Sequence, residues 1–307
     1  MRSLTSFVFL VCLSFVISCS DSDEPPLQEY RISGTLTIDG IPRTYMLNLP
    51  PDYYDAADFS LVIAMHGGGG DAAQFETASK LTEKADLFKF VVVYPEGVKS
   101  TGPLGARTWN AGGCCEYARD NNIDDVGFIT QLIDALIASY KINPKKIYAT
   151  GHSNGGMLAY RLACEVPDKV AAIATSACSM VVKQPCSPTR AVPVLHMHSV
   201  LDARIPYTGG VGVSSAYFPP LDSILNVWSL NDACANVAEI ITDDSSYKLT
   251  QWSDCTDDVL IQYYLTQDGG HAWPGGQPQG GPAADRPSLV INANDLLWDF
   301  FQQYQLP

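Results

Sequence analysis

The chain has 307 residues, 46% of them hydrophobic and 17% charged, and its formal net charge at pH 7 is -14. A chain of this size can bury one large core, and a single domain of this length is normal for α/β proteins. A protein this acidic repels polyanions, which argues against nucleic acid as a partner.

The beginning of the sequence is typical of an export signal. Arg2 precedes an apolar run from Phe7 to Ile17, which has the length of a signal-peptide core and is too short to span a bilayer. The four residues ending at Cys19 resemble a lipobox, so we expect residues 1–18 to be a lipoprotein signal peptide and Cys19 to carry the lipid. An ordinary secretory cleavage near the same place is the alternative, and either one exports the chain.

The residues after Cys19 predict a tether. The segment 19–30 begins with an acidic, proline-containing run that cannot bury anything. Such a run is either a plain linker or resembles an address for the outer cell surface. With lipid on Cys19, the expected partner is the outer membrane; without it, the protein is secreted.

The remaining chain alternates between strand and helix patterns. Residues 31–49 predict a pair of strands with a turn at Asp39-Gly40. Short, nearly continuous apolar runs, which suit strands buried on both faces, occupy residues 60–65, 90–94, 146–150 and 192–197. Helical spacing marks residues 125–140, 154–165, 223–230 and 294–304. This alternation predicts one α/β domain over residues 31–307, with a mostly parallel central sheet and helices on both of its faces.

The strongest motif lies between a predicted strand and a predicted helix. Residues 151–155 read Gly-His-Ser-Asn-Gly and match G-x-S-x-G. The small residues on either side allow a turn sharp enough to expose the hydroxyl of Ser153, and the following helix directs its N-terminus at a developing oxyanion. We therefore expect Ser153 to be a nucleophile.

A serine nucleophile needs a base and an acid, which follow it in that fold in the order acid, histidine. Three of the five histidines follow Ser153. His196 and His198 lie on a strand and suit packing or a supporting role, whereas His271 lies in a glycine-rich loop before the last helix. Among the acids between, Asp202 directly follows a strong central strand, at the edge where open α/β sheets bind ligands. We expect His271 to be the base and Asp202 to orient it.

The oxyanion of such a reaction needs two backbone N–H groups. Asn154 follows the nucleophile and should supply one. The second should come from Gly67 or Gly68, because residues 66–70 read His-Gly-Gly-Gly-Gly after a predicted strand and resemble the histidine-glycine loop of esterases. The alternative interpretation of these glycines, a dinucleotide fingerprint, fits less well, and we expect no nucleotide ligand.

Other residues are weaker candidates. Trp109, Trp273 and His152 lie near the glycine-rich loops or the serine and are candidates for the substrate cleft, although packing is the simpler role for the tryptophans. A stretch resembling a calcium loop begins at Asp120 but lacks the required glycine and glutamate. The sequence therefore predicts no metal site.

Nine cysteines are present, and export makes disulfides plausible. Seven remain once the signal and the lipid site are set aside, so at least one should be a free thiol. We expect Cys234 to bond to Cys255, across a predicted helix and a returning strand. A Cys178–Cys186 bond is a weaker prediction, and the adjacent Cys114 and Cys115 are not expected to bond to each other.

Six motifs in order carry a resemblance over nearly the whole chain from about residue 30. The chain is similar to the polyhydroxybutyrate depolymerase and feruloyl/acetylxylan esterase family of α/β-hydrolases, in its motifs HGGGG (66–70), YPEG (94–97), DDVGFI (124–129), ATGHSNGGML (149–158), H-x-H…D…PY-x-GG (196–210) and GGHAWPGG (269–276). The resemblance implies the same triad, the same oxyanion hole and no cofactor.

We expect an ester substrate, cleaved through an acyl-enzyme. The leading hypothesis is a feruloyl or acetyl esterase acting on plant cell-wall polysaccharide such as xylan. Depolymerisation of 3-hydroxybutyrate oligomers is the alternative, and a catalytically silent binding protein on the hydrolase scaffold is the alternative outside enzymes.

Overall fold

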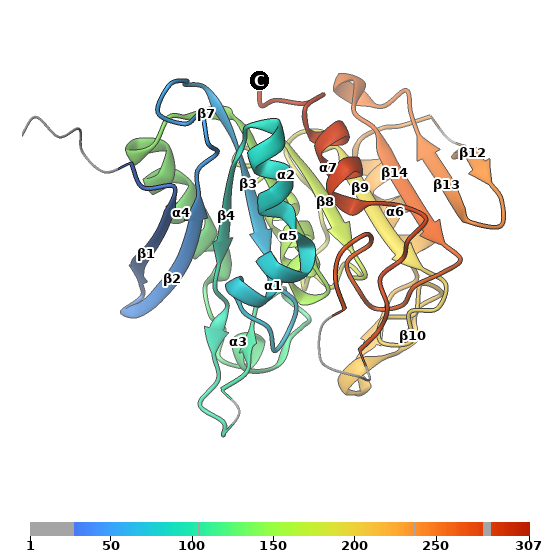
Figure 1. Ribbon diagram of the computed structural model, residues 1–307. Coiled ribbons are helices and arrows are strands. Elements are labelled where there is room, and N and C mark those ends of the chain that lie inside the picture. Colours follow the sequence, from blue (N-terminus) through green and yellow to red (C-terminus); the bar gives the residue numbers. More distant parts are fainter. Residues whose placement is uncertain (1–27, 104, 236, 279–283) are drawn as a thin grey trace, which may run out of the picture.

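A ten-stranded sheet forms the centre of the computed structural model, which describes residues 28–103, 105–235, 237–278 and 284–307 (Figure 1). The expected signal peptide, the lipid site at Cys19 and most of the tether lie outside these residues. The strand order is β1-β2-β4-β3-β7-β8-β9-β14-β13-β12. The bounds are β1 Arg31–Ile38, β2 Ile41–Asn48, β3 Phe59–Met65, β4 Val91–Pro95, β7 Ile142–His152, β8 Ala172–Ser176, β9 Val194–Ser199, β12 Glu239–Asp243, β13 Tyr247–Trp252 and β14 Ile261–Thr266.

The middle of this sheet is parallel. Strands β4, β3, β7, β8, β9 and β14 run in the same direction. The pairings at the two edges, β1 with β2, β2 with β4, β14 with β13 and β13 with β12, are antiparallel. Every residue of β4, β8 and β9 is buried, because helices cover both faces there. The mostly parallel sheet predicted from the unbroken apolar runs is confirmed.

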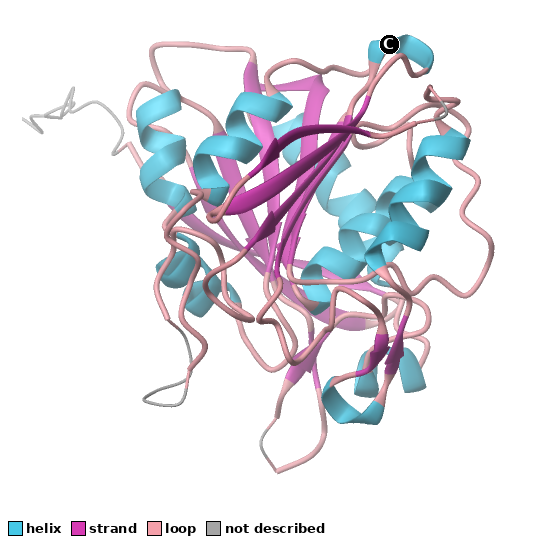
Figure 2. Cartoon of the chain, turned by 90° about the vertical axis from the view of Figure 1, so that its right-hand side faces the viewer, coloured by secondary structure: helices cyan, strands magenta, loops and turns pink. Residues whose placement is uncertain are grey.

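Helices lie on both faces of the sheet (Figure 2). One core cluster packs α4, α5 and α6 against one face, and a second packs α1, α2 and α7 against the other. Within the described ranges no helix is long and apolar enough to cross a membrane. The helices are α1 Ala72–Ser79, α2 Leu81–Phe88, α3 Glu116–Asp120, α4 Asp125–Ser139, α5 Asn154–Glu165, α6 Leu221–Asn231 and α7 Ala293–Phe301.

Two small hairpins stand outside the main sheet, below its carboxyl ends in Figure 1. Strand β5 (Val98–Lys99) pairs with β6 (Arg107–Thr108), and β10 (Gly210–Val211) pairs with β11 (Tyr217–Phe218). Short 3-10 turns occupy Val213–Ser215 and Thr256–Asp258. The β10–β11 hairpin therefore lies near the end of the sheet at which the loops after β3, β7 and β9 gather.

A buried ion pair fixes the start of α4. Asp124 caps the helix by accepting a hydrogen bond from Gly127 N–H at 2.8 Å. Asp125 points inward instead, where one carboxylate oxygen lies 2.6 Å from Arg43 Nη2 and the other accepts Asn110 N–H at 2.7 Å. Both charged side chains are almost fully buried. The pair therefore anchors the loop after β6 to the core.

The disulfides agree only in part with expectation. Cys234 is bonded to Cys255, the pairing that the sequence predicts. The predicted Cys178–Cys186 bond is wrong: Cys186 is bonded to Cys164 at the end of α5, and Cys178 is a buried thiol. Cys178 lies two residues after β8 and is fully buried, and any side chain at Gly156 would collide with its sulfur.

The expectation that Cys114 and Cys115 do not bond to each other is also wrong, because the two form a disulfide. The loop around them is tightly held. Ala111 N–H donates to Cys114 O at 2.6 Å, and Cys115 N–H donates to Trp109 O at 3.1 Å. These two hydrogen bonds anchor the backbone on both sides of the disulfide.

Candidate active site

Ser153 lies on a strained turn between β7 and α5. Its φ of 53° is in the left-handed region, which costs an ordinary residue roughly 1–3 kcal/mol. Two glycines make this turn possible. A Cβ on Gly155 would lie 2.2 Å from Met65 O, and one on Gly151 would lie 2.4 Å from Gly155 C. The start of α5 thus passes so close to β7 and to the neighbouring β3 that neither glycine position can hold a side chain.

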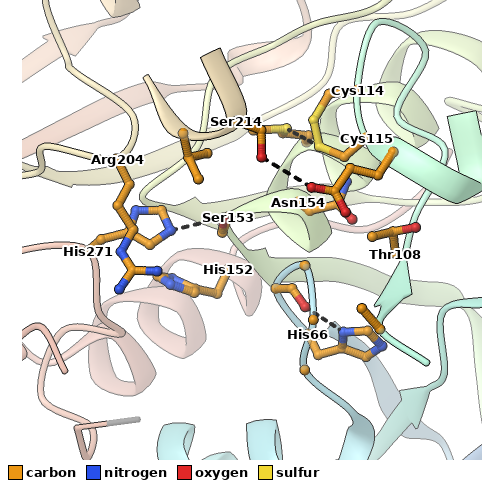
Figure 3. Close-up of a pocket in the computed structure, with 18 of the residues that line it drawn as sticks. His66, Thr108, Cys114, Cys115, His152, Ser153, Asn154, Arg204, Ser214 and His271 are labelled. Carbon is orange, nitrogen blue, oxygen red and sulfur yellow. Dashed lines mark hydrogen bonds between the residues drawn. A yellow bond between two sulfur atoms is a disulfide. The ribbon is translucent and has the colours of Figure 1, made fainter. Parts of the chain in front are cut away.

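Three side chains predicted from the sequence meet in one hydrogen-bonded chain. Ser153 Oγ lies 2.9 Å from His271 Nε2, and His271 Nδ1 lies 2.8 Å from Asp202 Oδ2 (Figure 3 shows the serine and the histidine). With the Nδ1 proton donated to Asp202, Nε2 can accept the serine proton. This is the arrangement of a nucleophile, a base and an orienting acid.

The carboxylate of Asp202 is held from both sides. Its Oδ1 accepts the backbone N–H groups of Arg204 and Ile205, each at 2.9 Å. Burial raises the pKa of Asp202, but the neighbouring His271 and the hydrogen bonds that the carboxylate accepts lower it more, so the pKa lies below the ordinary aspartate value. The group is therefore a carboxylate at neutral pH and can stabilise an imidazolium.

The loop that carries His271 is fixed through Asp268, just after β14. The Asp268 carbonyl accepts Ser199 Oγ–H at 2.8 Å, and its carboxylate accepts Ser288 Oγ–H at 2.5 Å and Leu289 N–H at 2.8 Å. The His152 ring packs against His271 with the ring centroids 4.8 Å apart. These contacts place the imidazole over the carboxyl end of the sheet.

The glycine loop after β3 approaches the serine closely. A Cβ on Gly67 would lie 3.4 Å from Ser153 Cβ, and one on Gly68 would lie 3.7 Å from Asn154 Cβ. Asn154 is the first residue of α5, where backbone N–H groups have no partner within the helix. The glycine loop therefore lies beside Ser153 and Asn154, as an oxyanion hole formed by these residues would require.

His66 holds this loop in place, a role that the sequence analysis missed. Its Nδ1–H donates to Gly67 O at 2.7 Å, and its Nε2 accepts Gly97 N–H at 3.0 Å. Burial lowers the pKa of His66 to about 4, so the ring is neutral and this one tautomer is fixed. The signal was present in the sequence, since His66 directly precedes the glycines.

Trp109 fixes the side chain of Asn154. Its backbone N–H donates to Asn154 Oδ1 at 2.7 Å, its carbonyl accepts Asn154 Nδ2–H at 3.0 Å, and its indole N–H donates to His66 O at 2.9 Å. Trp109 is fully buried and does not line the cavity, so its prediction as a cleft residue is wrong. These three hydrogen bonds keep the ring in the core.

Trp273, the second tryptophan predicted for the substrate cleft, is also buried, with 3% of its surface exposed. It packs edge-on against Phe75 and donates to Asn294 Oδ1 at 3.0 Å. It borders a cavity of about 30 Å³, which shares His152 and His271 with the main cavity, but it is not part of the main cavity's lining. His152, the third candidate, does line the main cavity.

A second chain of buried histidines reaches Asp202 from the core. His198 Nε2–H donates to Ile205 O at 2.8 Å and lies 3.4 Å from Asp202 Oδ2. His198 Nδ1 accepts from His196 Nε2 at 3.2 Å, and His196 Nδ1 accepts Tyr160 O–H at 2.8 Å. Burial lowers the pKa of both histidines. Both histidines are therefore neutral and support Asp202. From the sequence, their position on one strand suited either packing or a supporting role.

The serine opens into a cavity of about 520 Å³. His271, His152 and Arg204 border it on one side, and the Cys114–Cys115 disulfide borders it on the other (Figure 3). The glycine loop and Asn154 complete the floor. Pockets of roughly 300–1,000 Å³ hold small organic ligands, so the cavity is large enough for a substrate beside the hydroxyl.

The parallel sheet, the strained serine turn and the Ser-His-Asp chain together define an α/β-hydrolase. The family model described as Esterase PHB depolymerase matches residues 43–254, more than half of the chain. The chain therefore belongs to this family of esterases.

Three individual relatives share about a quarter of their aligned residues with this chain, or fewer. Feruloyl esterase B of Piromyces equi is 26% identical over 273 residues, which cover 86% of this chain and 46% of that protein. The bifunctional acetylxylan esterase/xylanase of Neocallimastix patriciarum is 25% identical over 263 residues, covering 81% of this chain and 32% of that protein. The chain thus spans less than half the length of these two curated relatives. The acetyl xylan esterase from Aspergillus awamori shares the fold, with a TM-score of 0.61 and 15% identity over 88% of this chain and 99% of that one.

Proposed function

We propose that the protein is an exported serine esterase that removes feruloyl or acetyl groups from plant cell-wall polysaccharide such as xylan. The observation that carries the proposal is the hydrogen-bonded chain from Ser153 Oγ through His271 to a buried, charged Asp202. A silent binding protein would have no use for a strained serine turn aligned with a base and an acid.

The geometry supports acyl transfer in two steps. Ser153 Oγ attacks the ester carbonyl while His271 Nε2 takes its proton, and the backbone N–H groups of Asn154 and Gly67 or Gly68 stabilise the oxyanion. His271 then gives the proton to the departing alcohol, which leaves an acyl-serine. A water molecule, deprotonated by His271, attacks this ester in the second step, and the acid is released as the serine regains its proton.

The names of the relatives support the proposed substrate class. Two of them bear names for feruloyl and acetylxylan ester cleavage, and an esterase outside the cell needs a substrate that is found there. The family description favours 3-hydroxybutyrate oligomers as the alternative substrate. Both substrates are carboxylic esters and would use the same three residues.

The test is an ester panel with a matched pair of variants. Purified protein should hydrolyse p-nitrophenyl acetate, and its rates on methyl ferulate, acetylated xylan and 3-hydroxybutyrate oligomers should rank the substrates. Ser153→Ala should lower turnover on the order of a million-fold. Ser245→Ala, at an exposed serine in the turn between β12 and β13, should retain full activity. A Ser153→Ala enzyme with a tenth of the normal rate would contradict the mechanism.

Export and anchoring are part of the same proposal. We infer that residues 1–18 are removed and that lipid on Cys19 attaches the protein to the outer membrane. Cys19→Ala should then release the protein from the membrane fraction or leave it unprocessed, with unchanged activity in vitro. Fully soluble wild-type protein that begins at another residue would contradict the lipid anchor.

A further inference from the structure

Sulfur lines the wall of the cavity on the side away from His271. The Cys114–Cys115 disulfide and Met157 of α5 both border the cavity, and Met157 Sδ lies 3.9 Å from Cys115 Sγ. Figure 3 shows the disulfide and His271 on opposite sides of Ser153. Sulfur is polarisable and makes favourable contacts with aromatic rings.

This wall is fixed relative to the reacting atoms. Trp109 O accepts Cys115 N–H at 3.1 Å and also accepts Asn154 Nδ2–H at 3.0 Å. The disulfide loop and the residue after the nucleophile are therefore joined through one carbonyl group. A group bonded to Ser153 would meet the sulfurs at a constant position, which is what selection by shape requires.

The β10–β11 hairpin continues the same wall. Val213, Ala216 and Phe218 border the cavity, and Ser214 Oγ donates to Glu116 Oε1 at 3.1 Å, directly beyond the disulfide. The hairpin is thereby connected to the first residue of α3, directly after the cysteine loop. The charged Glu116 and Arg119 also border the cavity here, so the sulfurs and the hairpin side chains form the apolar part of this wall.

The direction of the reaction assigns this wall to the acyl group. His271 must protonate the departing alcohol, so the alcohol lies on the His271 side, while the oxyanion faces Asn154 and the glycine loop. The acyl group then extends from Ser153 toward the disulfide. An acetyl group would fill little of a cavity of about 520 Å³, whereas a flat aromatic acyl group would cover the sulfurs and the hairpin.

We propose that Cys114, Cys115, Met157 and the hairpin residues 213–218 form an acyl subsite that selects aromatic, hydroxycinnamoyl-type acyl groups over acetyl. This inference rests on the proposed esterase function and adds to it the group that is recognised. The selection comes from a rigid sulfur and aliphatic surface, which gains contact area with a ring and gains almost none with a methyl group.

The test compares two valines on one hairpin. Val213 borders the cavity and is 44% exposed, while Val211 is 68% exposed and lies outside the cavity lining. Because both are exposed, an aspartate at either position should leave the fold intact. Val213→Asp should lower kcat/KM for methyl ferulate about tenfold more than for methyl acetate. Val211→Asp should change neither value.

The second variant removes the sulfurs directly. The Cys114→Ala/Cys115→Ala enzyme should lose methyl ferulate activity about tenfold more than methyl acetate activity, chiefly through KM. If the ratio of kcat/KM for methyl ferulate to kcat/KM for methyl acetate is unchanged in both variants, the subsite is overturned and the wall has only a structural role. If the cysteine variant fails to fold, the Val213→Asp ratio decides. A wild-type enzyme inactive on every ester would refute the esterase proposal itself, which the ratio does not test.

Discussion

Asp232, just after α6, should make the protein less stable as the pH rises toward neutrality. Its side chain is fully buried, with one carboxylate oxygen accepting Val192 N–H at 3.1 Å. The other oxygen has no hydrogen-bond partner among the residues that the structure describes. Burial raises the pKa of Asp232 to about 7, although the Val192 hydrogen bond and the Arg190 charge lower it in part.

The direction of this pH dependence follows from the linkage between proton binding and folding. The unfolded state has the ordinary aspartate pKa near 4, so above this pH the unfolded chain releases a proton that the folded chain keeps. Stability is therefore lost between about pH 4 and pH 7, and the loss levels off above the folded pKa. A difference of about three pKa units corresponds to roughly 4 kcal/mol at pH 7. Asp232→Asn removes this loss but buries an amide N–H₂ with an incomplete set of partners, at a cost of about 1–3 kcal/mol.

Asp232→Asn should thus stabilise the protein by roughly 1–3 kcal/mol at pH 7 and give no gain at pH 4. Urea unfolding at several pH values between 4 and 8 measures the difference. The exposed Asp254 provides a control, since Asp254→Asn should change the free energy of unfolding by less than about 0.5 kcal/mol. A gain that is the same at every pH, or a loss at pH 7, would refute the reasoning.

Three further outcomes are expected. Asp202→Asn should keep the fold but lower kcat about 10⁴-fold on small esters, because the imidazole loses its fixed tautomer; a loss under tenfold would contradict the role of the acid. His271→Gln should abolish turnover, whereas His198→Gln should retain far more activity, and the reverse ranking of kcat would move the base to β9. Cys234→Ser/Cys255→Ser should lower stability by roughly 3 kcal/mol with little change in kcat, which thermal unfolding with parallel assays can check.

Unbroken runs of large apolar side chains predict four of the central strands. Strands β3, β4, β7 and β9 coincide with the unbroken hydrophobic runs. Strand β8 was missed because Ala172–Ser176 is built from small and hydroxylated residues, although all of it is buried. Such a strand is recognised only by its neighbours β7 and β9, which the fold places on either side.

Helices α1 and α2 were missed for a different reason. Each has eight residues, and Lys80, with a φ of 56°, separates them. Their apolar residues are too few to give a helical period over a window of this length. Their buried faces are completed by α7 from the far end of the chain, which a local pattern does not contain.

The histidines show what sequence order can and cannot decide. Order and loop context selected His271 from three candidates, and the structure brings it to both Ser153 and Asp202. The same reasoning could not assign His66 or His198, because their hydrogen-bond partners lie in other segments. Gly97 N–H donates to His66 Nε2, and Ile205 O accepts from His198 Nε2–H.

Burial completes the distinction between these histidines. It lowers the pKa of His66, His152, His196 and His198, so these rings stay neutral and serve as fixed donors and acceptors. His198 also lies near Asp202, but at 3.4 Å, with its N–H directed at Ile205 O and its other nitrogen occupied by His196. It has no free nitrogen with which to accept a proton. His271 has one nitrogen hydrogen-bonded to Asp202 and the other facing the serine. In the proposed mechanism it is therefore the one histidine of the five that can accept the serine proton, and the Asp202 carboxylate already in contact with it stabilises the resulting charge.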